Sequence, residues 1–197
     1  MELYKELYAF IQPTMPGALK PVIIQAVKSA ARKFCRDTEA WRAEITIASL
    51  TTVASYSFSL ASYDAILLRV KSLTVNDNEL TASEYAVSLD GVSLTLASYP
   101  TKAEAAGIEM EVAMLPSITA GELSYPFFDR WSEAIVAAAK AILYKQPKKP
   151  YSDQRSAMDC EIDYHSLMSK CKAENYRQSR STDNTVDLSN ALAKGGW

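Results

Sequence analysis

The sequence contains few cysteines and one histidine, which argues against disulfide-bonded and metal-binding proteins. The three cysteines, Cys35, Cys160 and Cys171, are an odd number at irregular spacing and include no CxxC pair, so we expect reduced, mostly buried thiols. The only histidine, His165, has no HxxxH partner with which to hold a metal ion. Neither GxGxxG nor GxxxxGKS/T occurs, so nucleotide binding also lacks a signature. We therefore expect no metal and no cofactor.

A strong net charge and a long apolar run are missing as well. The formal net charge of -2 gives no field that would direct the protein to DNA, RNA or an acidic membrane as a main partner. The first residues, MELYKELYAFIQP, include acidic residues and lack the apolar core of a secretory signal. No uninterrupted apolar run is long enough to cross a bilayer. Because 48% of the residues are hydrophobic, we expect a soluble protein with a core of its own and no membrane partner.

Helical periodicity is present at both ends of the chain. A short helix over residues 3–11 is predicted to end at Pro13, and a second helix begins near Pro21. A third helix begins at Pro126, and a fourth follows Ser152, which we expect to cap it. The four apolar stripes are Leu3, Leu7, Phe10 and Ile11; Val22, Ile23, Ala26, Val27, Ala30, Ala31, Phe34 and Cys35; Phe127, Trp131, Ile135, Ala138 and Ile142; and Ala157, Cys160, Tyr164, Leu167 and Cys171.

Between Trp41 and about residue 120 the apolar period changes from 3.6 to 2. About six short strands follow one another without intervening helices, so the pairing should be mainly antiparallel. YAVSL and VSLTLA flank Asp90-Gly91, a dipeptide that favours a tight hairpin turn. Each strand alternates, which predicts a sheet with one buried face.

Together these segments predict an α+β fold, in which a helical bundle is built from N-terminal and C-terminal helix pairs. It carries a central antiparallel β insert and an extended C-terminal tail. The helix pairs must meet in space, because neither pair buries its stripe alone. The expected boundaries are residues 1–42 for the first helices, 43–120 for the β domain, 121–176 for the C-terminal hairpin and 177–197 for the tail.

The joint between the last two helices, ILYKQPKKPYSDQRSA, is the most unusual short stretch. Pro147 and Pro150 are expected to stop one helix and turn the chain, while Tyr151 covers the end of the hairpin. Its basic residues are Lys145, Lys148 and Lys149. They either neutralise a helix C-terminus or form a basic patch that faces a partner or DNA.

The stretch from residue 177 onward is polar and contains too little apolar surface to order itself. Its sizeable apolar residues are Val186, Leu188, Leu192 and Trp197. We expect them to dock on a partner protein or on a neighbouring subunit, with strand addition or insertion into a groove. The alternative is a tail that folds back on the bundle of its own chain.

Two alternative functions from other classes of protein remain open. A small hydrolase would need His165 beside a serine, but no GxSxG motif is present and Glu161 one turn earlier favours an exposed pair. The carboxylate pairs Asp159/Asp163 and Glu109/Glu111 are more typical of a solvated surface than of acid–base catalysis. A carbohydrate-binding β module would use Tyr56, Tyr63, Tyr85 and Tyr99, although tyrosines at strand spacing more often form core and cross-strand pairs.

Several linked motifs resemble the head-to-tail adaptor (connector) proteins of short-tailed bacteriophages, the tail-tubular-protein-A-like group. A Pro-Gly loop leads into a long helix that ends in Phe-Cys before an aromatic residue, a strand exits through Leu-Pro-Ser, and an Ala-rich helix precedes a Lys-Pro-aromatic-Ser elbow. In this sequence the motifs are Pro16-Gly17, Phe34-Cys35 with Trp41, Leu115-Pro116-Ser117, Trp131, and Lys149-Pro150-Tyr151-Ser152. Their order and spacing extend over roughly three-quarters of the chain.

The resemblance implies a non-enzymatic structural virion protein of the phage neck, assembled in the host cytoplasm. Family members form a ring, commonly of twelve subunits, that joins the portal protein to the tail nozzle or tail tube and leaves a channel for the genome. The resemblance therefore implies contacts with other copies, with the portal, with the tail and, transiently and non-specifically, with DNA. Another neck component, a head-completion or tail-terminator protein, is the alternative. A ring needs a heterologous interface, which we expect on the helical hairpin around Trp131 and on the β domain.

Overall fold

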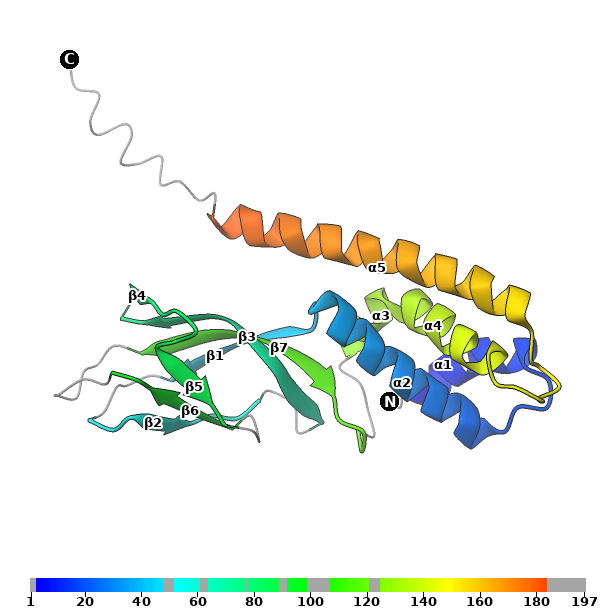
Figure 1. Ribbon diagram of the computed structural model, residues 1–197, viewed down its shortest axis with the longest axis horizontal. Coiled ribbons are helices and arrows are strands. Elements are labelled where there is room, and N and C mark those ends of the chain that lie inside the picture. Colours follow the sequence, from blue (N-terminus) through cyan, green and yellow to red (C-terminus); the bar gives the residue numbers. More distant parts are fainter. Residues whose placement is uncertain are drawn as a thin grey trace, which may run out of the picture.

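The computed structural model describes residues 3–47, 52–60, 64–76, 78–88, 92–98, 107–120 and 125–183. They build a helical bundle and two small β-sheets. The bundle lies toward one end of the long axis and both sheets lie toward the other (Figure 1). Helices and antiparallel strands occupy separate stretches of the chain, so the fold class is α+β, as the sequence predicts.

The first helices begin and end close to the prolines from which the sequence predicts their bounds. They are α1 (Leu3–Ile11), the 3₁₀ turn η1 (Gln12–Thr14) and α2 (Lys20–Thr38). Pro21 stands in the first turn of α2, where its missing N–H leaves no hydrogen bond unmade. The helix ends because Glu39 adopts a left-handed conformation (φ 49°) and its N–H donates to the Cys35 carbonyl at 2.8 Å.

The C-terminal helical region contains three helices, where the sequence predicts two. They are α3 (Tyr125–Arg130), α4 (Ser132–Tyr144) and α5 (Gln154–Asp183). The predicted helix from Pro126 breaks at Trp131, whose dihedral angles (φ -112°, ψ 16°) are not helical. Periodicity does not reveal the break, because Phe127 and Trp131 keep a helical spacing across it.

Helices from the two ends of the chain pack together, which confirms the predicted bundle. Helix α4 contacts α1, α2 and α5, and α2 also contacts α5. Small side chains on α4 allow this close approach on several sides; the buried alanines are Ala134, Ala137, Ala138, Ala139 and Ala141. The bundle is therefore centred on α4, the helix with the smallest residues.

The β region forms two antiparallel sheets, where the sequence predicts one. The strands are β1 (Arg42–Ile47), β2 (Ser55–Ser57), β3 (Ala65–Val75), β4 (Asn78–Glu79), β5 (Tyr85–Val87), β6 (Ser93–Leu96) and β7 (Ile108–Pro116). Their orders are β1-β7-β3-β4 and β2-β6-β5. The predicted hairpin corresponds to β5 and β6, which pair as far as Val87 and Leu94, while Asp90 and Gly91 lie outside the described residues.

Strand β7 links the sheets to the bundle. Its first half alternates between buried and exposed residues, but Val112, Ala113, Met114 and Leu115 are all buried. Helix α2 packs against β7 on the bundle side. The prediction of a sheet with one buried face is therefore wrong for this half of β7, because a helix covers the second face.

The C-terminal boundary also differs from the sequence-based prediction. Helix α5 continues to Asp183, so residues 177–183 are helical and do not belong to an extended tail. The stretch from Tyr176 to Asp183 contains no glycine or proline, and adding residues to an existing helix costs far less than starting one. Polar composition alone therefore placed the boundary too early.

Candidate assembly surfaces

The elbow between α4 and α5 is held by specific side-chain hydrogen bonds. Tyr151 is buried and its hydroxyl donates to Oε1 of Gln146 at 2.8 Å, so it covers the end of the hairpin as expected. The predicted cap, Ser152, is wrong. Asp153 caps α5 instead, because its Oδ1 accepts from the backbone N–H groups of Arg155 (2.9 Å) and Ser156 (3.3 Å).

The three lysines of the elbow do not act as one group. Lys145 forms an ion pair with Glu161 of α5 and so ties the two helices together. Lys148 adopts a left-handed conformation (φ 59°), and both Lys148 and Lys149 are exposed. Neither has an ion-pair partner among the described residues. Only these two side chains therefore remain available to a partner or to DNA.

The Pro-Gly loop before α2 lies directly against this elbow. Gly17 has a φ of 82°, which only glycine adopts without strain, and a Cβ there would lie 3.5 Å from Cγ of Pro150. Nearby, the Tyr144 hydroxyl donates to the Thr14 carbonyl at 3.5 Å. Two motifs far apart in the sequence thus meet at one end of the bundle.

An aromatic cluster joins α2 to the C-terminal helices. The ring of Phe34, fully buried, lies 5.9 Å from the Trp131 ring and 6.5 Å from the Tyr164 ring. Trp41 packs edge-on against Phe128 at 5.5 Å. Trp131 is only 8% exposed, so its own side chain contributes little to the surface of the hairpin around it. It stabilises the bundle instead.

A charged network fixes the bundle on the larger sheet. Glu39, at the end of α2, forms ion pairs with Arg69 and Lys71 of β3. The hydrogen bond from Lys71 lowers the pKa of Glu39 below its ordinary value, and the positive charge of Arg69 acts in the same direction. Arg32 of α2 also donates to the carbonyl of Pro116 at the end of β7. The Leu-Pro-Ser exit is therefore held by α2.

Polar groups also couple α2 to α5. The Tyr164 hydroxyl donates to Oδ2 of Asp37 at 2.7 Å, and Lys33 pairs with the same oxygen at 2.8 Å. Partial burial opposes ionisation of Asp37, but these two hydrogen bonds outweigh it and lower its pKa. Burial and the Asp37 carboxylate raise the pKa of Tyr164. The arrangement stabilises a charged carboxylate and a neutral phenol, which is a structural pairing.

The cysteines are free thiols in the bundle. Cys35 and Cys171 are buried and Cys160 is half-buried. Burial raises the pKa of Cys35, and it raises that of Cys171 to about 11. Both buried thiols therefore stay protonated at neutral pH, as expected for packing groups.

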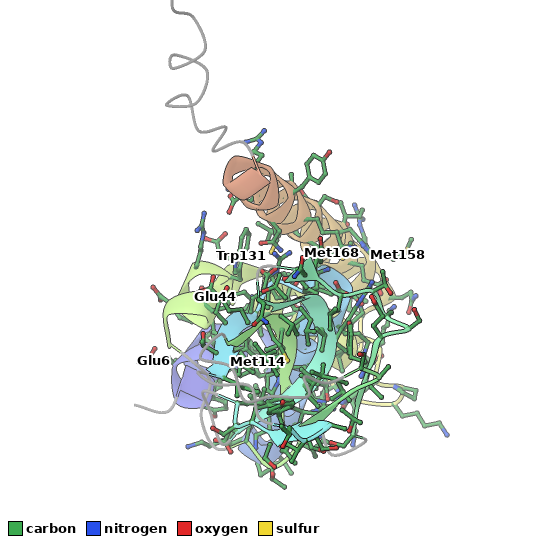
Figure 2. All side chains as sticks on the ribbon, turned by 90° about the vertical axis from the view of Figure 1, so that its left-hand side faces the viewer. Glu6, Glu44, Met114, Trp131, Met158 and Met168 are labelled. Atoms are coloured by element: carbon green, nitrogen blue, oxygen red, sulfur yellow. The ribbon has the colours of Figure 1, made fainter. Side chains whose placement is uncertain are left out.

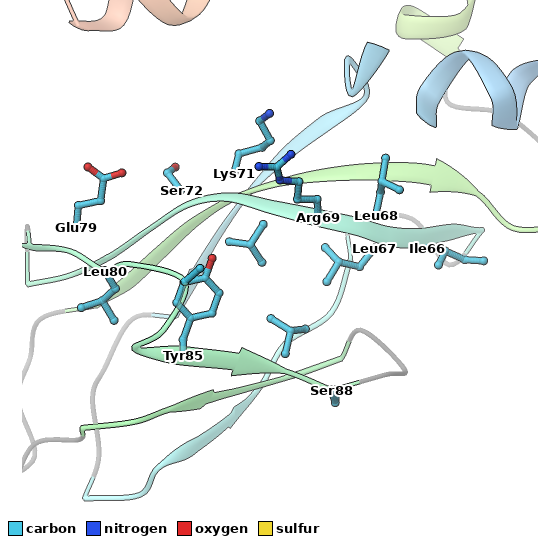
Figure 3. Close-up of a pocket in the computed structure, with 13 residues that line it drawn as sticks. Ile66, Leu67, Leu68, Arg69, Lys71, Ser72, Glu79, Leu80, Tyr85 and Ser88 are labelled. Carbon is cyan, nitrogen blue, oxygen red and sulfur yellow. The ribbon is translucent and has the colours of Figure 1, made fainter. Parts of the chain in front are cut away.

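A groove of about 610 Å³ lies between β3 and the segment that leads into β5 (Figure 3). Its lining includes Leu67 and Val70 of β3, Tyr85 and Val87 of β5, and charged side chains at the rim. Strand β3 pairs with β4 only at Thr74 and Val75, and two register shifts interrupt its pairing with β7. Bulges and charges of this kind protect a strand edge from further pairing.

The structure describes some of the residues on which a carbohydrate-binding module or a hydrolase would depend. Tyr56 is buried, Tyr85 lines the groove, and Tyr63 and Tyr99 lie outside the described residues. His165 is exposed on α5, with its ring against that of Tyr164 at 5.4 Å. Within the described ranges, no three histidine, cysteine or carboxylate side chains gather as metal ligands would. No helix of those ranges is both long enough and apolar enough to cross a membrane.

The predicted docking residues of the tail cannot be placed. Val186, Leu188, Leu192 and Trp197 lie outside the described residues. The structure also reveals large apolar side chains that are more than half exposed: Phe10, Leu19, Ile118, Met158, Ile162 and Tyr176. Phe10 belongs to the predicted stripe of the first helix, so that prediction is wrong for this residue, and the sequence analysis did not single out the others. The three on α5 stand at helical spacing opposite the predicted packing stripe, a signal that was present in the sequence.

Comparison with models of known protein families gives no match, and comparison with curated protein sequences gives none either. Among solved structures, one chain of the neck of an empty GTA particle, computed with C6 symmetry, aligns with 86% of this chain and 88% of its own length. The two sequences are 10% identical over the alignment and the TM-score is 0.32. A likeness of this size carries no inference about what this chain does.

Proposed function

We propose that the protein is a structural component of a bacteriophage neck, a ring-forming head-to-tail adaptor that joins the portal to the tail and leaves a channel for the genome. The proposal combines the resemblance of the sequence motifs with the positions of those motifs in the fold. It assigns the chain a structural role with no catalytic centre and no cofactor.

The contact between the Pro-Gly loop and the Lys-Pro-Tyr-Ser elbow carries the proposal. Gly17 and Pro150 are far apart in the sequence, yet an added Cβ at Gly17 would lie 3.5 Å from Pro150. The other motifs belong to the same framework, since Phe34 packs on Trp131 and Arg32 binds the carbonyl of Pro116. The motifs that carry the resemblance therefore form one connected scaffold, which supports the view that they belong together.

The shape of the molecule agrees with a linking role. The bundle and the β-sheets lie toward opposite ends of the long axis, so the chain presents two chemically different ends to two partners (Figure 1). Exposed Lys148 and Lys149 lie at the bundle end and would provide a transient, non-specific contact with DNA in a channel. The C-terminal residues 184–197 would attach to the portal or to the adjacent subunit through Val186, Leu188, Leu192 and Trp197.

The direct test is native mass spectrometry of the chain, alone and mixed with purified portal rings. We expect a closed oligomer, about twelve copies in the presence of the portal, and a stable complex between the two. A chain that binds tail tube but never the portal would favour a tail-terminator role and contradict the proposal. The variant His165→Ala should assemble normally, whereas a hydrolase would lose turnover of its substrate with this change.

The role of the tail is tested by a chain that ends at Asp183, the last residue of α5. It should fold and remain soluble but no longer attach to portal rings. A full-length variant with Val186→Ser, Leu188→Ser and Trp197→Ala keeps the tail length and tests the apolar anchors themselves. Normal attachment of both variants would show that the tail has no docking role.

A further inference from the structure

Helix α5 has a second, largely apolar face whose side chains are exposed to solvent. Residues at spacings of three and four lie on one side of a helix. The side of α5 opposite the bundle is formed by Met158, Ile162, Ser166, Ser169, Ala173 and Tyr176, which we name the outer α5 face. All six residues are exposed and uncharged, and Met158, Ile162 and Tyr176 are 56%, 67% and 66% exposed.

The opposite side of α5 packs against the rest of the bundle. Ala157, Tyr164 and Cys171 are buried against the rest of the bundle. A helix that only covers a bundle presents charged or polar residues on its solvent side, whereas this side carries Met158, Ile162 and Tyr176. Here the outer α5 face extends over about 27 Å at 1.5 Å per residue without a charge. Such a face is typical of a helix that packs on both sides.

A second exposed apolar surface lies on the connection between α1 and α2. It is formed by Ala9, Phe10, Pro13, Pro16 and Leu19, which we name the α1–α2 patch. Phe10 is 66% exposed and Leu19 is 70% exposed, although both are large apolar side chains. The stretch from residue 7 to residue 19 contains no charged residue. An exposed apolar surface of this kind marks a contact site.

The α1–α2 patch and the first turns of the outer α5 face lie at the same end of the bundle but on different sides. The contact of Gly17 with Pro150 places the α1–α2 connection beside the elbow, and Met158 lies one turn into the helix that follows that elbow. Helix α4 packs against both α1 and α5 and separates them. Figure 2 shows Glu6 of α1 and Met158 of α5 toward opposite edges of the molecule.

Acidic side chains border the first turns of the outer α5 face. Asp159 and Asp163 are exposed there and have no ion-pair partner among the described residues, whereas exposed Lys170 and Lys172 border its later turns. Lys20 is exposed at the edge of the α1–α2 patch, with its ammonium 5.5 Å from the ring centre of Tyr8. Opposite charges around an apolar centre favour one orientation of the contact.

We infer that the outer α5 face of one copy packs against the α1–α2 patch of the next copy. Two different surfaces on different sides of one subunit make a heterologous contact. Because both surfaces reach the elbow end of the bundle, the contact can repeat from copy to copy around a closed ring. The occupant of each surface is a second copy of this chain. The inference rests on the proposed ring and specifies which surfaces build it.

The test uses the full chain and two variants, Ile162→Glu on the outer α5 face and Phe10→Glu on the α1–α2 patch. Sedimentation velocity over a dilution series up to about 1 mM measures self-association. Each variant should raise the apparent Kd about thirtyfold or more, because a charge is buried at the centre of the contact. Ile118→Glu is the matched control, since Ile118 is also 67% exposed but belongs to neither surface; it should associate like the unchanged chain. Circular dichroism confirms that each variant is folded.

Mixing the two variants gives the decisive result. The Phe10→Glu chain keeps an intact outer α5 face and the Ile162→Glu chain keeps an intact α1–α2 patch, so together they should form one good contact and stop at a heterodimer. The substitution Lys20→Glu should weaken association, and adding Asp163→Lys to the same chain should restore it.

Other outcomes separate this inference from the proposed function. If the unchanged chain associates and both variants associate equally well, the ring exists but uses other surfaces, and the inference alone is overturned. If Phe10→Glu associates normally while Ile162→Glu does not, α5 packs on α5 in a symmetric dimer and the inference is again wrong. If the unchanged chain stays monomeric over the whole series and in the presence of portal rings, the proposed ring fails as well.

Discussion

The bundle and the smaller sheet differ in how many side chains they bury and in the length of the elements that bury them. Helices α2, α4 and α5 are 19, 13 and 30 residues long, and each adds many side chains to one aromatic-centred core. Strands β2, β5 and β6 have three, three and four residues, and their largest buried side chains are Tyr56, Leu94 and Leu96. A sheet of this size has few contacts to lose, so its stability depends on single residues and on the larger sheet beside it.

This difference predicts that the two regions open independently. Cores with many shared contacts unfold as cooperative units, whereas small satellites open at lower free energy. The larger sheet stands between them, since β7 packs against α2 and pairs with β1 and β3. Substitutions in the core of each region should therefore differ both in the size and in the extent of their effects.

Phe34→Ala should destabilise the whole molecule by about 3–5 kcal/mol, because it removes a fully buried ring at the centre of the aromatic cluster. The free energy of unfolding is measured by denaturant titration at low protein concentration. Phe10→Ala is the matched control, since Phe10 is 66% exposed and should change stability by less than about 0.5 kcal/mol. Equal effects of the two changes would show that the cluster is not the centre of the core.

Leu94→Ala should cost less, about 2–3 kcal/mol, and should act locally. Leu94 is fully buried and lies opposite both Tyr56 of β2 and Val87 of β5, so its removal weakens both pairings of the smaller sheet. Hydrogen exchange should show lost protection in β2, β5 and β6 and unchanged protection in α2 and α4. Loss of protection in the bundle would mean that the two regions form one cooperative unit.

The same difference explains how much of the fold the sequence predicts. Helix periodicity repeats over many residues, so most residues of the stripes predicted for α2 and α5 are buried, while Val22, Cys160 and Leu167 are half-buried. The split into two sheets depends on contacts between distant strands, such as β1 with β7, which no local pattern encodes. The break at Trp131, whose ring packs on Phe34, is likewise invisible to periodicity.

The candidate surfaces show the same limit. The elbow and the role of Tyr151 follow from two prolines and an aromatic residue in one short stretch, and both were predicted. The pairing of Lys145 with Glu161 was not, because it requires the distance between α4 and α5. The outer α5 face has a visible spacing, but only the structure shows that the opposite side of the helix is the buried one.

Glu39→Gln tests the joint between the bundle and the larger sheet, with an expected cost of about 1 kcal/mol at pH 7 for a partly exposed ionic network. The pKa of Glu39 in the folded chain is lowered, so its stabilising effect is complete above the ordinary value of 4.5 and disappears as the pH falls below it. The difference between the variant and the unchanged chain should therefore be present at pH 7 and vanish in acid. Arg69→Gln should have a smaller effect, because the Arg69 side chain is 65% exposed. If the free energy of unfolding of Glu39→Gln differs from that of the unchanged chain by the same amount at every pH, the lost stability belongs to the helix end and not to the ion pairs.

The smallest effect is expected at the start of α5, where Asp153→Ala removes the cap and should lower the Tm by about 2 °C. Hydrogen bonds from Ser156 lower the pKa of Asp153, so the cap is effective above the ordinary carboxyl pKa and is lost as the pH falls below it. Ser152→Ala is the matched control, because Ser152 is the neighbouring residue that the sequence suggested as the cap. Thermal unfolding at pH 7 should show a shift for Asp153→Ala and none for Ser152→Ala. If Ser152→Ala lowers the Tm as much, the helix begins one residue earlier than Gln154 and the capping assignment is wrong.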